Sequence, residues 1–459
     1  MSDSPSGSPH KLKYVDPISF TPHFSRKSIR KRGSSSEEIF CEGVLLESVA
    51  DAAGTPVYLY SRAAIEDAYR ELDRGLGSLP HTLCFAVKSN GNLSILNQLA
   101  QMGSGFDIVS GGELDYLRRI GVRGNRIVFS GVGKDQHEIR EALNYRATRG
   151  GRAGILLFNV ESEAELDVLV GEAARQVQRG NAPSAVAIRV NPDVLAGGHP
   201  HIATGRHEHK FGLDWTGARR LYFAHRNSKW IRWQGISMHI GSQITSLEPF
   251  RRAVHRLAGY VGGLRRGGID LRYLDVGGGL GVQYTDQRVP TRATYACLVA
   301  QLVRKLGVHL LLEPGRSIIA PAGVLLTRVL YTKTNRGKTF VVVDSAMNDL
   351  MRPALYGAIH PITKVRQERQ EKGTPLKRVD VVGPVCETGD CFLHDWPLGE
   401  VQTGDVLAIW AAGAYGMAQA SNYNARRRPA EVLVEGNRFR LIRRRETQSD
   451  LVRTDIFEK

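Results

Sequence analysis

The sequence predicts an α/β fold, a (β/α)8 TIM-type barrel joined to a second, mainly antiparallel β-sandwich or β-barrel domain. Eight short apolar runs alternate with helix-like segments between residues 62 and 321. Eight β/α units in a stretch of this length are what a closed parallel barrel requires. After residue 322 helix-like segments become rare, and short strand-like runs are separated by Gly, Pro and Asp turns. That pattern is typical of antiparallel β structure.

The first 38 residues differ in composition from the rest. They are rich in Ser, Pro and basic residues, have little apolar periodicity and end in RKRGSSSEE. A segment of this composition lacks the apolar side chains that a packed core needs. We therefore expect residues 1–38 to be a mobile, basic N-terminal extension.

The β domain is expected to be discontinuous in the sequence. Pro56 marks the start of a strand-like run, TPVYLYS, that precedes the first helix of the barrel. We assign this run to the second domain, which then comprises residues 39–61 and 322–455. The barrel, residues 62–321, is inserted between the two parts.

The expected barrel strands are short and mostly apolar, as parallel strands covered on both faces should be. In chain order they are TLCFAVK (82–88), GFDIVS (105–110), RIVFSG (126–131), ILLFNV (155–160), AVAIRVN (185–191), IRWQGISMHI (231–240), LRYLDVGGG (271–279) and HLLLEPG (309–315). Most precede an amphipathic segment. A doubly wound open sheet is the competing fold, but GGGLG at 277–281 comes too late and has the wrong spacing for its dinucleotide-binding fingerprint.

The composition is that of a globular protein and not of a membrane protein or a disulfide-rich secreted protein. The chain is 42% hydrophobic and 24% charged, as ordinary globular proteins are. It has no apolar run long enough for a bilayer and no apolar core of a signal peptide. Its five scattered cysteines suggest neither a disulfide framework nor a paired metal motif. We expect a cytoplasmic protein that does not associate with membranes.

The net charge of +16 raises the question of nucleic-acid binding. The basic residues are dispersed, and their densest runs lack the interleaved aromatic residues of a single-strand platform. Attraction of small anionic substrates accounts for the charge more simply. We predict no nucleic-acid partner.

Polar residues follow the predicted barrel strands, where the functional mouth of such a barrel lies. Lys88 follows an apolar run, and a partly desolvated lysine can form a Schiff base with an aldehyde. Taken alone, it is more simply a solvated strand-end lysine. The glycines 277–279 expose backbone N–H groups that, with Ser242 and Arg316, favour a phosphate site. The full set is Lys88, Asp107, Ser110, Arg189, Asn191, His239, Ser242, Gly277, Gly278, Gly279, Glu313 and Arg316.

Ten ordered blocks resemble those of the diaminopimelate decarboxylases, fold-type III enzymes that pair an alanine-racemase-like barrel with a β domain. The blocks are FAVKSN, GSGFDIVSGGEL, FNVES, TGRHEHKFG, GISMHIGSQI, LDVGGGLG, EPGRS, MRPALYGAIH, GPVCETGD and AYGMAQASNYN. The similarity spans roughly residues 40–450. It implies pyridoxal 5'-phosphate as cofactor and, as the reaction, decarboxylation of meso-2,6-diaminopimelate to L-lysine and CO2, the last step of lysine biosynthesis.

The resemblance also implies roles around the cofactor. Lys88 would hold it as a Schiff base, Glu313 would face the pyridine nitrogen, and a carboxylate there keeps the ring protonated. His239 would lie on the ring face. Asp107 would lie near the Schiff base, and Arg189 would brace the cofactor's hydroxyl side. The phosphate ligands would be Gly277, Gly278, Gly279, Ser242, Arg316 and Tyr415.

Substrate recognition is likewise implied by the resemblance. Arg352 would hold the carboxylate that is kept, because its planar fork matches a carboxylate. Glu387 would contact the distal ammonium, and Cys386 would donate the proton after CO2 leaves. The family supplies these two from the partner subunit, which implies a homodimer with shared active sites. The implied substrate-binding residues are Arg316, Arg352, Tyr356, Glu387 and Tyr415.

Some residues depart from the family pattern or suggest other readings. Thr388 stands where the family usually has serine, and Arg427 where it has proline. His207, Glu208 and His209 resemble a metal cluster, but this decarboxylation needs no metal and we expect none.

Three alternative functions stay open. A related enzyme could act on D-lysine, D-ornithine or a carboxylated polyamine, although Arg352 favours a diacid. A non-catalytic cofactor-binding barrel would not need the added β domain with Cys386 and Glu387. For a racemase, no tyrosine base is evident in the second domain.

Overall fold

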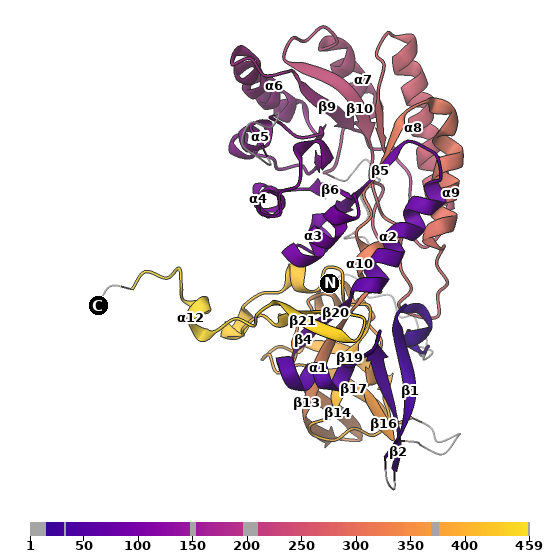
Figure 1. The fold of residues 1–459 in the computed structure, drawn as a ribbon, viewed down its shortest axis with the longest axis vertical. Coiled ribbons are helices and arrows are strands. Elements are labelled where there is room, and N and C mark those ends of the chain that lie inside the picture. Colours follow the sequence, from indigo (N-terminus) through magenta and orange to yellow (C-terminus); the bar gives the residue numbers. More distant parts are fainter. Residues whose placement is uncertain (1–14, 32–33, 147–152, 196–209, 369–375, 458–459) are drawn as a thin grey trace.

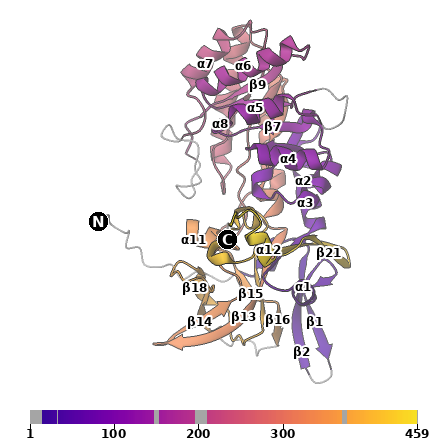
Figure 2. The ribbon, with the colours of Figure 1, turned by 90° about the vertical axis from the view of Figure 1, so that its left-hand side faces the viewer.

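The computed structural model describes residues 15–31, 34–146, 153–195, 210–368 and 376–457. It has a barrel with its helices at one end and a β-rich domain at the other (Figures 1 and 2). No helix among the described residues has the length and apolar character needed to cross a membrane. This two-part architecture confirms the predicted fold class.

Eight parallel strands close the barrel in sequence order, with β12 pairing back to β5. All eight predicted strands are confirmed. They are β5 (His81–Ala86), β6 (Gly105–Ile108), β7 (Ile127–Phe129), β8 (Leu157–Val160), β9 (Ser184–Arg189), β10 (Ile231–Ser237), β11 (Tyr273–Asp275) and β12 (His309–Leu312). Apolar side chains, among them Cys84, Val128 and Leu311, fill the interior. The barrel is therefore a packed core, and its chemistry is confined to the strand ends.

Helices surround the barrel. At the start of most of them a side chain accepts a hydrogen bond from a backbone N–H group of the first turn. Ser61, Ser110 and Ser162 cap α2, α4 and α6, and Asp135 forms a capping box at α5. Such caps fix the residue at which each helix begins and so set the strand-to-helix turns. The helices are α2 (Arg62–Leu76), α3 (Leu93–Gln101), α4 (Gly111–Arg119), α5 (Gln136–Leu143), α6 (Glu163–Gln178), α7 (Trp215–Ala224), α8 (Glu248–Arg266), α9 (Arg292–Val303) and α10 (Arg316–Ile319).

The second domain contains a nine-stranded sheet and a four-stranded sheet. Most pairs are antiparallel, but β14–β17 and β4–β20 are parallel. The large sheet holds β4 (Val57–Ser61), β13 (Gly323–Asn335), β14 (Lys338–Val343), β15 (Ile362–Lys364), β17 (Arg378–Val382), β18 (Cys391–Pro397), β19 (Val406–Ile409), β20 (Ala430–Glu435) and β21 (Arg438–Arg443). The short helices are α1 (Leu46–Ala53), α11 (Arg352–Tyr356) and α12 (Gln448–Leu451). Because β4 lies between β13 and β20, the chain passes through this domain before it builds the barrel.

The N-terminal segment differs from the prediction of a mobile extension up to residue 38. A hairpin of β1 (Phe24–Lys31) and β2 (Ser34–Cys41) forms the small sheet with β3 (Val44–Leu45) and β16 (Arg366–Glu368). Phe24 packs edge-on against Trp410, with ring centroids 5.2 Å apart. The hairpin has few apolar residues because much of it faces solvent, and its partner strand β16 lies more than 300 residues away in the sequence. Local composition therefore could not reveal it. Residues 1–14 lie outside the described part.

Glu431 on β20 links the two domains through a fully buried carboxylate. It accepts hydrogen bonds from Tyr60 Oη on β4 (2.7 Å) and from Asn92 Nδ2, which caps the barrel helix α3 (2.7 Å). Arg443 on β21 completes the set. A buried carboxylate is stable only when such donors replace its water.

Replacing Glu431 by Ala should lower the free energy of unfolding by about 2–3 kcal/mol, because buried donors lose their acceptor. Urea unfolding followed by tryptophan fluorescence would measure it. Glu435→Ala on the same strand is the control; its partners Arg62 and Arg440 lie at the surface, so the loss should stay below about 1 kcal/mol. Equal losses in the two variants would contradict the importance of this junction.

Candidate active site

Lys88 lies in a short 3-10 turn (η2, Val87–Ser89) directly after β5. Its Nζ is 2.9 Å from Oδ2 of Asp107, the last residue but one of β6, which is fully buried. Burial disfavours the charged amine, but the charge of Asp107 and the hydrogen bond to its carboxylate outweigh burial and raise the pKa of Lys88. The free amine is therefore held as an ammonium facing Asp107. It can react with an aldehyde only after that proton has moved.

Glu313 and Asp275 form a buried carboxyl pair where β12 and β11 end. Asp275 accepts hydrogen bonds from Asn159 Nδ2 and from the N–H of Gly277, both at 2.9 Å. Burial, followed by the charges of Asp107 and Asp275, raises the pKa of Glu313 well above its usual value. Burial also raises the pKa of Asp275, to about 6. The raised pKa favours a protonated Glu313, in a site where a basic nitrogen could share the proton.

His239 follows β10 and presents a neutral imidazole. Its Nδ1 accepts a hydrogen bond from the N–H of Gly278 at 3.1 Å, so the ring proton lies on Nε2. Burial, with the charges of Lys88 and Arg189, holds the pKa of His239 well below its usual value. A neutral flat ring beside a charged lysine suits stacking on another ring.

The glycines after β11 pack too closely for side chains. A Cβ on Gly278 would lie 2.2 Å from the carbonyl oxygen of Glu313, and one on Gly277 would lie 2.7 Å from His239 Nδ1. Gly277 and Gly279 also have positive φ angles, of 67° and 107°. This bare backbone can approach a phosphate closely, which side chains would prevent.

Arg316 and Arg352 are buried arginines that share one hydrogen-bond acceptor, the Tyr284 hydroxyl group. Arg316 donates to Ser242 Oγ from Nε (3.2 Å) and Nη2 (3.1 Å), and to Tyr284 Oη from Nη1 (3.0 Å). Arg352, at the start of α11, donates from Nη1 to Tyr284 Oη at 3.1 Å. Neither guanidinium has an ion pair with the residues that the structure describes. Buried cations without a carboxylate partner mark a site for anions.

Other predicted residues lie around this site with partners of their own. Arg189, which ends β9, forms an ion pair with Glu161 at 2.8 Å. Tyr415 lies under Arg316, 4.8 Å from guanidinium to ring centroid, and its N–H donates to Ser89 at 2.8 Å. Tyr356 follows Arg352 on α11 and accepts a hydrogen bond from a glutamine at 3.3 Å.

Cys386 and Glu387 lie in the β17–β18 connection and are exposed. Cys386 Sγ contacts Asn424 Oδ1 at 3.7 Å, and Glu387 accepts a hydrogen bond from Tyr423. These partners belong to the second domain. Within one chain, therefore, the described contacts of Cys386 and Glu387 do not lead to Lys88.

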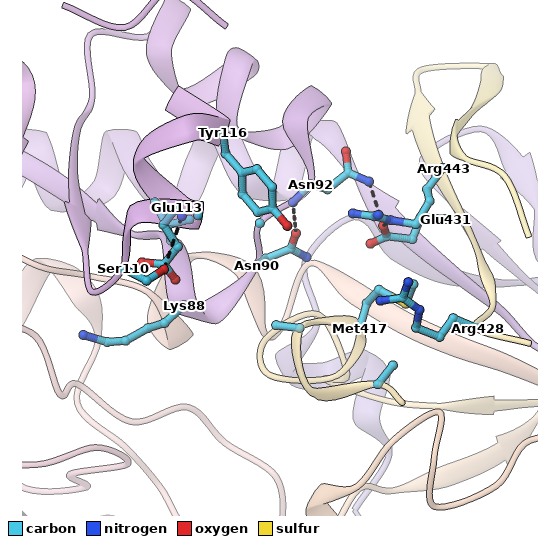
Figure 3. Close-up of a pocket in the computed structure, with 15 residues that line it drawn as sticks. Lys88, Asn90, Asn92, Ser110, Glu113, Tyr116, Met417, Arg428, Glu431 and Arg443 are labelled. Carbon is cyan, nitrogen blue, oxygen red and sulfur yellow. Dashed lines mark hydrogen bonds and ion pairs between the residues drawn. The ribbon is translucent and has the colours of Figure 1, made fainter. Parts of the chain in front are cut away.

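A cavity of about 370 Å³ lies beside Lys88 at the junction of the two domains. Ser110, Glu113 and Tyr116 line it from the barrel, and Arg428 and Met417 from the second domain, whereas the Lys88 side chain points away from Tyr116 (Figure 3). Burial raises the pKa of Glu113 to about 7. The Lys88 turn is therefore bordered by a cavity with polar lining residues from both domains.

Sequence reasoning missed Asp275, Tyr284 and His360. Asp275 and His360 are part of the blocks LDVGGGLG and MRPALYGAIH, so attention to every polar residue in those blocks could have found them. Tyr284 follows the glycine run by five positions and carries no pattern of its own. Only its contacts with Arg316 and Arg352 in the folded protein indicate that Tyr284 belongs to the site.

Among the residues that the structure describes, one cluster of side chains could supply metal ligands. Donor atoms of Asp380, Cys391 and His394 lie within 4.8 Å of one another. Lys338 Nζ lies 2.7 Å from Asp380 Oδ2 and already neutralises it. The cluster is thus satisfied as an ion pair. His207, Glu208 and His209 lie outside the described residues.

The site fits pyridoxal phosphate. Lys88 offers an amine for the aldehyde, Glu313 a carboxyl group for the ring nitrogen, and His239 a flat ring face. The glycine run, with Ser242 and Arg316, offers donors for a phosphate. Asp107 Oδ1 is buried without a partner among the described residues, as expected of an atom that a bound group completes.

Comparison with known proteins agrees with this site. Residues 62–320 match the family model "Pyridoxal-dependent decarboxylase, pyridoxal binding domain". A diaminopimelate decarboxylase of Pseudomonas aeruginosa is 46% identical, over 90% of this chain and 96% of that protein. The crystal structure of the Helicobacter pylori enzyme complexed with L-lysine has a TM-score of 0.82 and 39% identity, over 89% of this chain and 98% of that one. The chain therefore belongs to the pyridoxal-dependent decarboxylases and, among them, to the diaminopimelate decarboxylase family.

Proposed function

We infer that the chain decarboxylates meso-2,6-diaminopimelate to L-lysine and CO2. The observation that carries this inference is the pair of buried guanidiniums, Arg316 and Arg352, without ion pairs to described residues. A cofactor phosphate accounts for the first, and the second suits a carboxylate that the substrate keeps. The names of the relatives, and the L-lysine in a related structure, support the same substrate and product.

The cofactor of this family is pyridoxal phosphate, which supplies an electron sink for the electron pair left when CO2 departs. The residues of the chain prepare the site for it. We propose that Lys88 is its attachment point and that Asp107 Oδ2, 2.9 Å from Nζ, receives the lysine proton. Glu313 holds a proton for the ring nitrogen, and His239 limits the tilt of the ring.

The remaining residues of the site would hold the cofactor and the substrate in position. Ser242, Arg316 and the N–H groups of the glycines 277–279 would hold the phosphate, with Tyr415 beneath Arg316. Arg189 is held by Glu161 and would brace the hydroxyl side. Arg352 and Tyr356 lie on one short helix, α11, so one element presents both to the substrate.

We propose that Cys386 and Glu387 act in the site of a second copy of the chain. Both are exposed and are held by residues of the second domain. Cys386 would donate the proton that replaces CO2, and Glu387 would bind the distal ammonium. A homodimer would therefore contain two shared sites.

The alternatives are not favoured. A D-lysine or D-ornithine decarboxylase has no second substrate carboxylate for Arg352. A non-catalytic cofactor-binding protein would have no use for that anion site. The cytoplasm stays the predicted location, in keeping with five cysteines that are all free.

After incubation with pyridoxal phosphate and removal of the unbound cofactor, Lys88→Ala should lack the visible absorbance of the unaltered protein, because no amine is left for the covalent bond. In the unaltered protein the band should shift on borohydride reduction. Absorption spectra before and after reduction provide the measurement, with the exposed Lys229→Ala as control. An unchanged spectrum in Lys88→Ala would refute the assignment.

Arg352→Lys should raise KM for meso-diaminopimelate by roughly ten- to a hundredfold, because a bidentate contact becomes a single one. CO2 release from D-lysine, which lacks the second carboxylate, should be slow and equally slow in both proteins. The exposed Arg226→Lys serves as control. Faster release from D-lysine than from meso-diaminopimelate by the unaltered protein would exclude the proposed substrate.

Mixing Lys88→Ala with Cys386→Ala should restore about a quarter of the original activity, since half of the dimers would be mixed and one of their two sites would be intact. Each variant alone should be inactive. Activity is measured as CO2 release after subunits have exchanged. If Cys386 served its own chain, no site in the mixture would be complete and activity would not return.

A further inference from the structure

Tyr284 occupies the space between the two arginines of the anion site. Its hydroxyl oxygen accepts hydrogen bonds from Nη1 of Arg316 (3.0 Å) and Nη1 of Arg352 (3.1 Å). The guanidinium of Arg352 also lies 5.1 Å from the centroid of the tyrosine ring. One phenol thus contacts both cations.

The hydroxyl group of Tyr284 has one proton without an acceptor among the described residues. A tyrosine hydroxyl group has two acceptor sites and one proton, and the arginines occupy both acceptor sites. His360, whose ring is 5.1 Å away, cannot take the proton. Its Nδ1 donates to the Trp410 carbonyl oxygen (2.8 Å), and its Nε2 accepts from Arg352 (2.6 Å). The described residues provide no other acceptor for the Tyr284 proton.

The same contacts determine how Arg352 faces the site. Its Nη1 is occupied by Tyr284 and His360. Nε and Nη2 make no hydrogen bond to the described residues. These two groups form one of the edges with which an arginine binds a carboxylate in bidentate fashion. Tyr284 and His360 therefore turn that edge of Arg352 outward.

The electrostatics agree with this arrangement. Burial by itself would raise the pKa of Tyr284, but the charges of Arg352 and Arg316 outweigh it and place the pKa below the usual value. A phenol of lowered pKa is a stronger hydrogen-bond donor. A bound anion would be the natural acceptor for its proton.

We propose that Tyr284 is a positioning residue that joins Arg316 and Arg352 into one anion-binding unit and donates its O–H to the anion bound there. The identity of that anion rests on the proposed function: with cofactor and substrate bound, the O–H faces the retained substrate carboxylate beside Arg352, and in the cofactor-free protein it faces a phosphate beside Arg316. Tyr284 thus couples the binding of the two. It contributes to the preference for a diacid.

The test replaces Tyr284 by Phe, which keeps the ring and removes the hydroxyl group. KM for meso-diaminopimelate should rise about tenfold while kcat changes by less than about threefold, as loss of one charge-assisted hydrogen bond predicts. Independently of turnover, the Kd of inorganic phosphate for the cofactor-free protein, measured by calorimetry, should also rise about tenfold. Tyr295→Phe is the matched control, because the buried Tyr295 hydroxyl group has no hydrogen-bond partner in the part of the chain that the structure describes; it should change neither value.

The outcomes separate this inference from the proposed function. Unchanged KM and unchanged phosphate Kd in Tyr284→Phe, or a loss confined to kcat, would overturn the role of Tyr284. If the unaltered protein released no CO2 from meso-diaminopimelate, the function would fail, and the phosphate Kd would still decide the inference. If Tyr284→Phe did not fold, as judged by circular dichroism, His360→Asn would take its place; a KM equal to that of the unaltered protein would then count against the arrangement.

Discussion

The candidate site depends on the hydrogen bonds that hold the Lys88 turn against the second domain. Ser89 accepts from the N–H of Tyr415, Asn90 Nδ2 donates to the Gly413 carbonyl oxygen at 3.1 Å, and Asn92 donates to the buried Glu431. Three nearly successive polar residues of the barrel thus find their partners in another domain. A turn at a barrel mouth would otherwise have polar groups exposed to water. Here those groups have partners within the protein, and both domains hold the turn that carries the lysine.

The buried charges around this turn are unevenly divided. Asp107, Asp275 and Glu313 bring three carboxyl groups to one buried region, which a single lysine does not neutralise. The raised pKa of Glu313 resolves the imbalance, because a protonated carboxyl group carries no charge. On the other side, Arg316 and Arg352 leave an excess of positive charge. The site is therefore divided into a proton-holding half and an anion-binding half, as the chemistry of an anionic cofactor and an acidic substrate requires.

The strands of the barrel were predictable because each is buried on both faces and reads as a continuous apolar run. The hairpin of residues 24–41 was not, because only one of its faces is buried and its anchor, Trp410, is far away in the sequence. Similar logic applies to the site. Lys88, Asp107 and Glu313 stand at the ends of such runs, where position alone makes them candidates. Tyr284 stands in a loop, and nothing in its neighbours signals that two arginines meet there.

The sequence by itself determined the fold class, the family resemblance and the residue types available at the barrel mouth, since these depend on local apolar patterns and on short motifs. Only the tertiary structure decided how they interact: the tautomer of His239, the raised pKa of Glu313, the outward edge of Arg352 and the shared acceptor Tyr284. Each of these depends on which groups lie within hydrogen-bond distance after burial removes water. Residues that are 68 positions apart, such as Tyr284 and Arg352, meet only through folding.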